Sequence, residues 1–239
     1  MEWSKFKDQF DESWHDKMRP FIESKECDDI YEFLKKESKR GKKIAPLSSN
    51  TFRAFKETKL TNLKVVMMGM CPYHTFKDGE PVADGLLMGC SVTEKLQPSL
   101  EKFYRGLEDE LHDGLELRIK KSPDVSYLAN QGVLMFNAAL TTEMNKAGSH
   151  IDLWEPFTKY VFENIINYTG VPIIFLGKDA GKYERYTAPM AWIFTLSHPA
   201  SAAYKQTDWD TEGVFTKVNK ILEGNNNFEI DWLDVFPPF

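Results

Sequence analysis

Several features are scarce or missing in this chain. It has only three cysteines among 239 residues, too few for a disulfide framework. No run approaches the roughly 20 apolar residues that span a bilayer, and the mixed-charge N-terminus lacks the apolar core of a signal peptide. Acidic residues outnumber basic ones, and the net charge of −6 argues against a protein that coats nucleic acid non-specifically. We therefore expect a cytoplasmic protein that does not associate with membranes.

The bulk composition is that of a soluble globular protein. Hydrophobic residues make up 42% of the chain and charged residues 28%. No internal repeat, low-complexity stretch or linker interrupts the sequence. We expect one domain that spans residues 1–239.

Four short apolar runs alternate with segments of helical periodicity. Strands that alternate with helices imply a parallel sheet with helices on both faces. We therefore predict an α/β fold in three layers, α/β/α, around a central four-stranded parallel sheet. Helices are expected in the first 60 residues, where Trp3, Phe6, Phe10 and Trp14 recur at helical spacing, and at 99–111, 154–168 and 214–224. The expected strands are 65–68, 133–136, 173–176 and 192–196.

Each expected strand is followed by a polar loop. The loops read GMCPYH, NAALTT, GKDAGK and SHPAS. In open parallel sheets, ligands bind outside the carboxyl ends of the strands. A single polar residue at such a position can simply cap a strand, but four such loops on one edge indicate a binding site.

The residues in these loops suit a nucleotide. Tyr73 and His74 follow a proline, which gives a rigid turn with an aromatic wall and a titratable group. Asn137 can read the edge of a base. The Pro98-Ser99 pair precedes a helix, whose free backbone N–H groups attract phosphate. Together with the lysines of GKDAGK, these features fit a pocket for an extruded base flanked by phosphate contacts.

Six motifs in order along the chain, and a closing tail, resemble those of the uracil-DNA glycosylase superfamily, and most closely the uracil-DNA glycosylase family itself. KVVMMGMCPYH resembles the water-activating loop, usually GQDPYH, and VADGLLMGCSV resembles the base-stacking segment, usually GLAFSV. QPSL is similar to the proline-rich phosphate loop, and NQGVLMFNAALT to the strand with the base-reading asparagine. LGKDAGK and LSHPASAAY resemble the WGxxAxxK and HPSPLS loops, and FEIDW resembles the closing tail.

The resemblance implies a role for each matching residue. Asn137 would bind the Watson–Crick edge of the base, and Tyr73 would lie against its C5 atom, with Met70 also beside the base. His198 would donate a hydrogen bond to the O2 atom of the departing base. The DNA backbone would be contacted by the remaining matching residues, Pro98, Ser99, Lys178, Lys182 and Ser201. The family needs no cofactor and no metal, and we expect none here.

Cys71 stands where the family has its water-activating aspartate, and a thiol is not a carboxylate. Losing an acid–base group typically costs ~10²–10⁴ in rate. The loop that follows carries Asp78, Glu80 and Asp84, and we predict Asp84 as the replacement because it precedes Gly85. A thiolate nucleophile at Cys71, activated by a neighbouring histidine, is an alternative. No further residues at zinc-finger spacing support a metal site.

Two further departures concern the base and its extrusion. Met88 replaces the stacking phenylalanine, and methionine fills irregular space. The leucine that the family inserts into DNA is missing from HPASAAY, unless Tyr204 replaces it. Without such a wedge, weakened or single-stranded targets are favoured, since extruding their bases costs least.

These observations predict a monofunctional DNA glycosylase, which hydrolyses an N-glycosidic bond and leaves an abasic site. Its substrate is uracil or a C5-modified pyrimidine such as those of some viral genomes. The alternative is a catalytically inactive module that binds DNA or docks a protein. We expect a monomer that acts on DNA, single-stranded or with a flipped base. A protein inhibitor or replication partner stays open.

Overall fold

The computed structural model describes residues 1–111 and 119–235. Its centre is a parallel sheet of four strands in the order β5-β2-β7-β8. The strands are β2 (Val65–Gly69), β5 (Val133–Asn137), β7 (Ile173–Leu176) and β8 (Ile193–Leu196). Every residue of the first three is buried, as expected for strands covered on both faces. The predicted fold class is confirmed.

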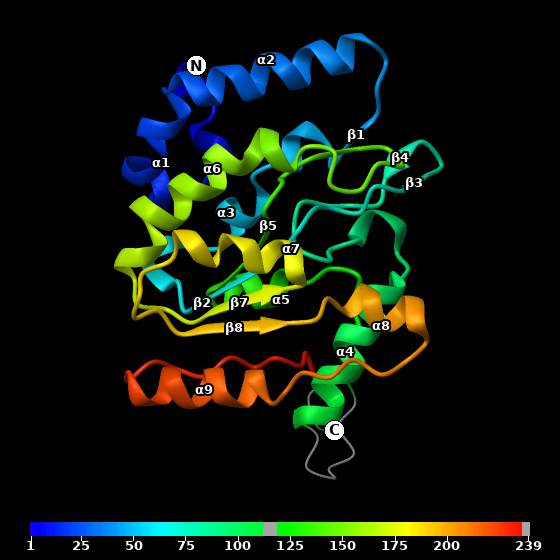
Figure 1. Ribbon diagram of the computed structural model, residues 1–239, viewed down its shortest axis with the longest axis vertical. Helices are drawn as coiled ribbons and strands as arrows, with labels where there is room; N and C mark the ends of the chain where they lie inside the picture. Colours follow the sequence, from blue (N-terminus) through cyan, green and yellow to red (C-terminus); the bar gives the residue numbers. More distant parts are fainter. Residues whose placement is uncertain (112–118, 236–239) are drawn as a thin grey trace.

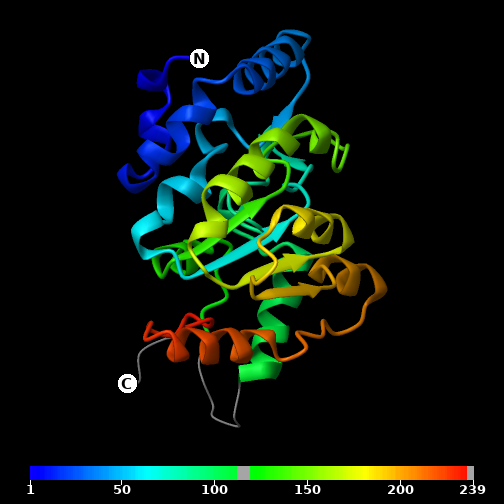
Figure 2. The ribbon, with the colours of Figure 1, turned by 60° about the vertical axis from the view of Figure 1, so that its left-hand side comes forward.

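Helices cover both sides of this sheet (Figures 1 and 2). On one side lie α1 (His15–Ile22), α2 (Lys25–Lys39), α3 (Arg53–Glu57) and α6 (Ile151–Asn164), and on the other α4 (Pro98–Leu111) and α9 (Val214–Gly224). The shorter helices are α5 (Ser126–Asn130), α7 (Lys178–Gly181) and α8 (Pro199–Lys205).

Two small antiparallel ladders lie outside the main sheet. β1 (Ile44–Ala45) pairs with β6 (Thr142–Glu143), and β3 (Phe76–Lys77) pairs with β4 (Glu80–Pro81). The β3–β4 hairpin follows directly from the loop after β2, so it borders the carboxyl edge of the sheet (Figure 1). None of the described helices is long and apolar enough to cross a membrane.

The start of the chain corrects one prediction. The helical spacing of the first aromatic residues corresponds to three 3-10 turns, Trp3–Lys5, Lys7–Gln9 and Glu12–Trp14, and α1 begins only at His15. Phe10 is extended, with φ −125° and ψ 148°, and the side chain of Asp11 accepts a hydrogen bond from the N–H of Ser13. This cap favours a new turn over a continuous helix.

Candidate active site

The carboxyl ends of the four strands meet at one edge of the sheet. Gly69, at the end of β2, pairs in register with Asn137, at the end of β5. The other two strands end in register at Leu176 and Leu196, and His198 follows two residues later. All four loops therefore open at the same edge, as their polar residues predicted.

Gly69 marks the point where two polar side chains converge. A Cβ atom built on this glycine would lie 2.8 Å from Oδ1 of Asn137 and 3.7 Å from Nε2 of His198. It would also lie only 2.5 Å from Cδ1 of Leu87. A larger residue would therefore clash with Leu87 and with the amide of Asn137, so this position requires glycine.

Asn137 has an unused hydrogen-bond acceptor. The residue is 4% exposed, and its Oδ1 atom has no hydrogen-bond partner within the described chain. A buried polar atom without a partner is costly, and native proteins rarely keep one. Because this unpaired acceptor lies beside Gly69 and near the imidazole of His198, it is a candidate ligand-binding atom.

His198 is held as a neutral hydrogen-bond donor. Its Nδ1 atom accepts a hydrogen bond from the N–H of Ala200 at 3.1 Å and thereby caps α8. An acceptor Nδ1 places the ring proton on Nε2, which is the nitrogen nearest to Gly69. Burial lowers the pKa of His198 to about 4, because a charged imidazolium loses its hydration there.

Cys71 lies in the loop after β2, as a protonated thiol. Its Sγ atom accepts a hydrogen bond from the N–H of Gly148 at 3.2 Å. Burial nevertheless raises the pKa of the thiol, so the thiolate that nucleophilic attack requires is disfavoured. In the described part of the chain, no three His, Cys, Asp or Glu side chains gather as metal ligands.

His74 closes the same loop and also has an unused polar atom. Its Nδ1 is buried and has no partner among the described residues, while its carbonyl oxygen accepts a hydrogen bond from the N–H of Asn145 at 2.9 Å. The sequence predicted His74 as a titratable group of this turn and as a possible activator of Cys71, but not as the base for water. Its unpaired nitrogen is a candidate base that the folded chain alone reveals.

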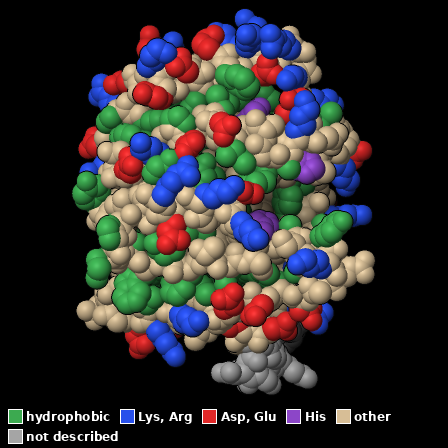
Figure 3. Space-filling model, viewed as in Figure 1, with side chains coloured by type: hydrophobic (Ala, Val, Ile, Leu, Met, Phe, Trp, Pro, Cys, Tyr) green, Lys and Arg blue, Asp and Glu red, His purple; other side chains and the backbone are tan. Residues whose placement is uncertain are grey.

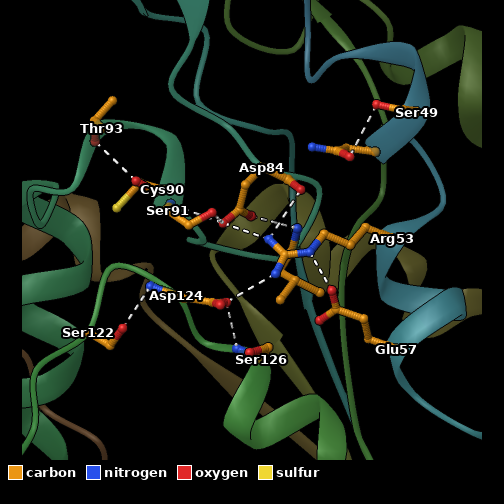
Figure 4. Close-up of polar contacts among 12 residues, drawn as sticks. Ser49, Arg53, Glu57, Asp84, Cys90, Ser91, Thr93, Ser122, Asp124 and Ser126 are labelled. Atoms are coloured by element: carbon orange, nitrogen blue, oxygen red, sulfur yellow. Dashed lines mark hydrogen bonds and ion pairs between the residues drawn. The ribbon is translucent and has the colours of Figure 1, made fainter.

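Asp84 is held away from the role predicted for it (Figure 4). Its carboxylate is 1% exposed and forms an ion pair of 2.8 Å with Nη1 of Arg53. It also accepts hydrogen bonds from the N–H of Leu86, at 3.1 Å, and from the N–H and hydroxyl of Ser91, at 3.1 and 2.7 Å. With its lone pairs occupied, this carboxylate anchors the loop between β4 and α4, and the structure gives no support to its activating water.

Tyr73 and Ser99 contact each other. Their hydroxyl oxygens are 2.6 Å apart, and Ser99 is 4% exposed. This bond joins the loop after β2 to the first turn of α4, and it fixes the tyrosine ring. Because the hydroxyl of Ser99 is committed to Tyr73, the backbone N–H groups at the start of α4, beside the exposed Pro98, are the better phosphate ligands in this helix.

Neither of the two methionines predicted at the base is among the side chains nearest to Gly69, whereas a leucine is. Met88 is 5% exposed and has a positive φ of 60°, a conformation that is uncommon for residues other than glycine. Leu87 is the side chain against Gly69, and sequence comparison with the stacking motif did not identify it. Met70 is half-buried, and its Cε atom lies 3.5 Å from where a Cβ of Gly148 would stand.

The other residues predicted to contact DNA follow β7 and β8: Lys178 is on α7, Lys182 begins the 3-10 helix after it, and Ser201 is on α8. Lys178 and Ser201 are exposed, whereas Lys182 forms an ion pair of 2.5 Å with Asp179. Tyr204, near the end of α8, is 91% exposed. An aromatic side chain this exposed has few protein contacts to lose when it meets another molecule.

Comparisons with known proteins agree with this geometry. No protein-family model matches the chain. It is 34% identical over 225 residues to the uracil-DNA glycosylase of Pseudomonas aeruginosa, covering 92% of this chain and 93% of that protein. It is 32% identical over 228 residues to the uracil-DNA glycosylase of Acinetobacter baumannii, covering 94% and 92%.

The fold also matches solved structures. The crystal structure of mimivirus uracil-DNA glycosylase superposes with a TM-score of 0.81 at 22% identity, over 97% of this chain and 89% of that one. A uracil-DNA glycosylase structure from Nitratifractor salsuginis gives a TM-score of 0.58 at 17% identity, over 85% and 92%. With bacterial relatives above 30% identity along almost its whole length, the chain belongs to the uracil-DNA glycosylase family.

Proposed function

We propose that this protein is a monofunctional DNA glycosylase that hydrolyses the N-glycosidic bond of uracil in DNA and leaves an abasic site. The observation that carries the proposal is that the unpaired Oδ1 of Asn137 and the neutral imidazole of His198 both lie beside Gly69, at the carboxyl edge of the sheet. The names of the bacterial relatives support the same reaction.

Asn137 recognises the base, and His198 stabilises it as it is released. The amide oxygen of Asn137 accepts from N3–H of uracil, and its NH₂ group donates to O4. When the C1′–N1 bond breaks, its electron pair moves into the ring and O2 becomes negative. The Nε2–H of His198 donates to that oxygen. One such donor contributes ~10²–10³ in rate.

The attacking water needs an acceptor for its proton, and the protonated thiol of Cys71 is a poor one. The unpaired Nδ1 of His74, three residues later in the loop, is the acceptor that we assign. The water oxygen bonds to C1′ of the deoxyribose, Nδ1 takes one of the two protons, and solvent later removes it. Such general base catalysis contributes ~10²–10⁴ in rate.

Uracil is the substrate that the position of Tyr73 favours over a C5-modified pyrimidine. The Tyr73 ring is fixed by the contact of its hydroxyl with that of Ser99 at 2.6 Å. A substituent on C5 of the base would therefore clash with an aromatic ring that cannot easily move. The DNA backbone would then pass over the start of α4 and the exposed Lys178 and Ser201, with Tyr204 beside the extruded nucleotide. We expect the protein to act as a monomer.

Single-turnover excision from a uracil-containing duplex, followed by alkaline cleavage of abasic sites, tests the proposal. Asn137→Ala should slow excision by ~10²-fold or more, since it leaves the buried edge of the base unpaired. Asn62→Ala, at an exposed position before the amino end of β2, is the matched control and should excise at the wild-type rate. Wild-type protein that binds uracil-containing DNA but releases no base would support an inactive DNA-binding module instead.

A further inference from the structure

A second positive surface lies at the end of α2, outside the motifs described so far. Six of the nine residues from 35 to 43 are lysine or arginine, in a chain whose net charge is −6. We call residues 35–43 the basic segment. Figure 3 shows basic side chains gathered at the top of the molecule, over the end of α2. A cluster of one sign on an acidic protein indicates a partner of the opposite charge.

Half of this positive charge is neutralised within the protein. Glu37 is 5% exposed and pairs with Arg40, at 2.8 Å, and with Lys42. Lys42 also pairs with Glu143 at 3.1 Å, and at the start of the segment Lys35 pairs with a neighbouring glutamate on α2. The Lys42–Glu143 pair joins the end of this segment to β6, and the other pairs lie within α2 and the turn after it, so these charges have a structural role.

The other three lysines remain available. Lys36, Lys39 and Lys43 are exposed, and none of them forms an ion pair with any residue that the structure describes. Their charges are therefore not compensated by the fold. The nearest acidic residues of the β3–β4 hairpin, Asp78 and Glu80, are exposed as well and weaken the local positive potential without removing it.

The basic segment adjoins the active-site loop. The ammonium group of Lys43 lies 5.8 Å from the centre of the Phe76 ring, two residues after His74. The carbonyl oxygen of Lys43 accepts a hydrogen bond from the N–H of Met144 at 2.8 Å, and the same short stretch continues to Gly148, which donates to Cys71. The basic segment is therefore in contact with the loop that carries His74 and with the stretch that contacts Cys71.

We propose that the basic segment binds the backbone phosphates of DNA that flanks the target nucleotide, through Lys36, Lys39 and Lys43. The inference rests on the proposed function in one respect, namely that the DNA bound here is the DNA whose base is excised. Phosphate contacts of this kind carry no sequence information, but they position a protein and raise its affinity by releasing counterions. Proximity to the active-site loop favours DNA over an acidic protein, because Lys43 lies over the ring of Phe76, two residues after His74.

The test is the salt dependence of DNA binding by a triple variant, Lys36→Gln, Lys39→Gln and Lys43→Gln. Fluorescence anisotropy would measure Kd for a long duplex with a non-hydrolysable deoxyuridine analogue. The slope of log Kd against log salt should fall by about 2 to 3, since each phosphate contact contributes ~0.9. The matched control, Lys17→Gln, Lys56→Gln and Lys59→Gln, removes equal charge from exposed positions away from this edge and should keep the wild-type slope.

A second measurement, of base excision, distinguishes failure of this proposal from failure of the proposed function. Excision from a trinucleotide, which is too short to reach the segment, should be unchanged in the triple variant. Equal slopes for the two triple variants would overturn the proposal. If the Lys36, Lys39 and Lys43 variant keeps the wild-type slope but no longer binds an acidic peptide, the segment binds a protein partner instead. If the wild type excises no base, the proposed function fails, and the slopes still decide whether the segment contacts DNA.

Discussion

The thiol of Cys71 accepts a hydrogen bond from the backbone N–H of Gly148, with 3.2 Å between the sulfur and the nitrogen. The N–H is therefore directed at the position that holds a carboxylate in the family motif. A backbone donor of this kind stabilises a carboxylate more than a thiol, because hydrogen bonds to charged acceptors are stronger. The surroundings of Cys71 remain suited to an aspartate, although the side chain has changed.

Cys71→Asp should therefore increase uracil excision, by ~10-fold or more, because it restores a general base where a donor already stabilises it. Single-turnover rates on a uracil-containing duplex would measure the gain. Cys71→Ser is the control, since serine accepts the hydrogen bond of Gly148 but cannot act as a base, and it should show no increase. An aspartate variant no faster than the serine variant would contradict the argument.

His74→Ala should lower the rate of excision by ~10²–10⁴, since it removes the acceptor for the proton of water. Thr75→Ala changes the exposed neighbour and should have little effect. The effects of changing Cys71 and His74 on the rate should also be non-additive, because both positions would serve to accept the proton of the same water. In a Cys71→Asp background, His74→Ala should therefore cost much less, and an equal loss in both backgrounds would mean that His74 acts only in structure.

The pH dependence of stability should report on His198. Its pKa is lowered from 6.5 to about 4 in the folded protein, so between these values the unfolded chain binds a proton that the folded chain does not. Stability is thus fully present above about pH 6.5 and is lost as the pH falls toward 4. Urea unfolding at about pH 7 and pH 5 should show this loss in the wild type and in His15→Gln, but a smaller one in His198→Gln.

Asp84→Asn should destabilise the protein by about 3–5 kcal/mol, because it leaves the half-buried guanidinium of Arg53 without its innermost partner. Asp124→Asn, which removes a 41% exposed partner of the same arginine, should cost much less. Folded Asp84→Asn protein should still excise uracil at nearly the wild-type rate. A large loss of rate at unchanged stability would return Asp84 to the catalytic role that its sequence position suggested.

The difference between what the sequence predicted and what it missed has a physical basis. β2, β5 and β7 are nearly continuous apolar runs, a local pattern that indicates burial on both faces. Asn137 was identified because a polar residue ends such a run. The ion pair of Asp84, by contrast, is formed with Arg53, 31 residues earlier. The two side chains come into contact only in the folded chain. Leu87 carries no chemical signal at all, and only packing against Gly69 reveals it.

Substrate choice should depend on the contact between Tyr73 and Ser99. Burial raises the pKa of Tyr73, so its hydroxyl stays protonated and the contact of 2.6 Å with the hydroxyl of Ser99 persists at neutral and moderately alkaline pH. A tyrosine fixed in this way excludes a substituent on C5 of the base. We therefore expect the wild type to excise uracil in preference to 5-hydroxymethyluracil and to the 5-hydroxymethyl and glucosylated forms of cytosine.

Two variants distinguish the effect of the Tyr73 ring on substrate preference from the effect of its contact with Ser99. Tyr73→Ala removes the wall and should reduce the preference for uracil most, whereas Ser99→Ala keeps the ring but releases its hydroxyl, and should reduce the preference less. Competition between duplexes that carry the four bases would give the ratio of rates for each protein. If the wild type instead prefers a bulky C5-modified base, the departures at Cys71 and Met88 are adaptations to that base, because a pocket that had merely decayed would gain no new preference.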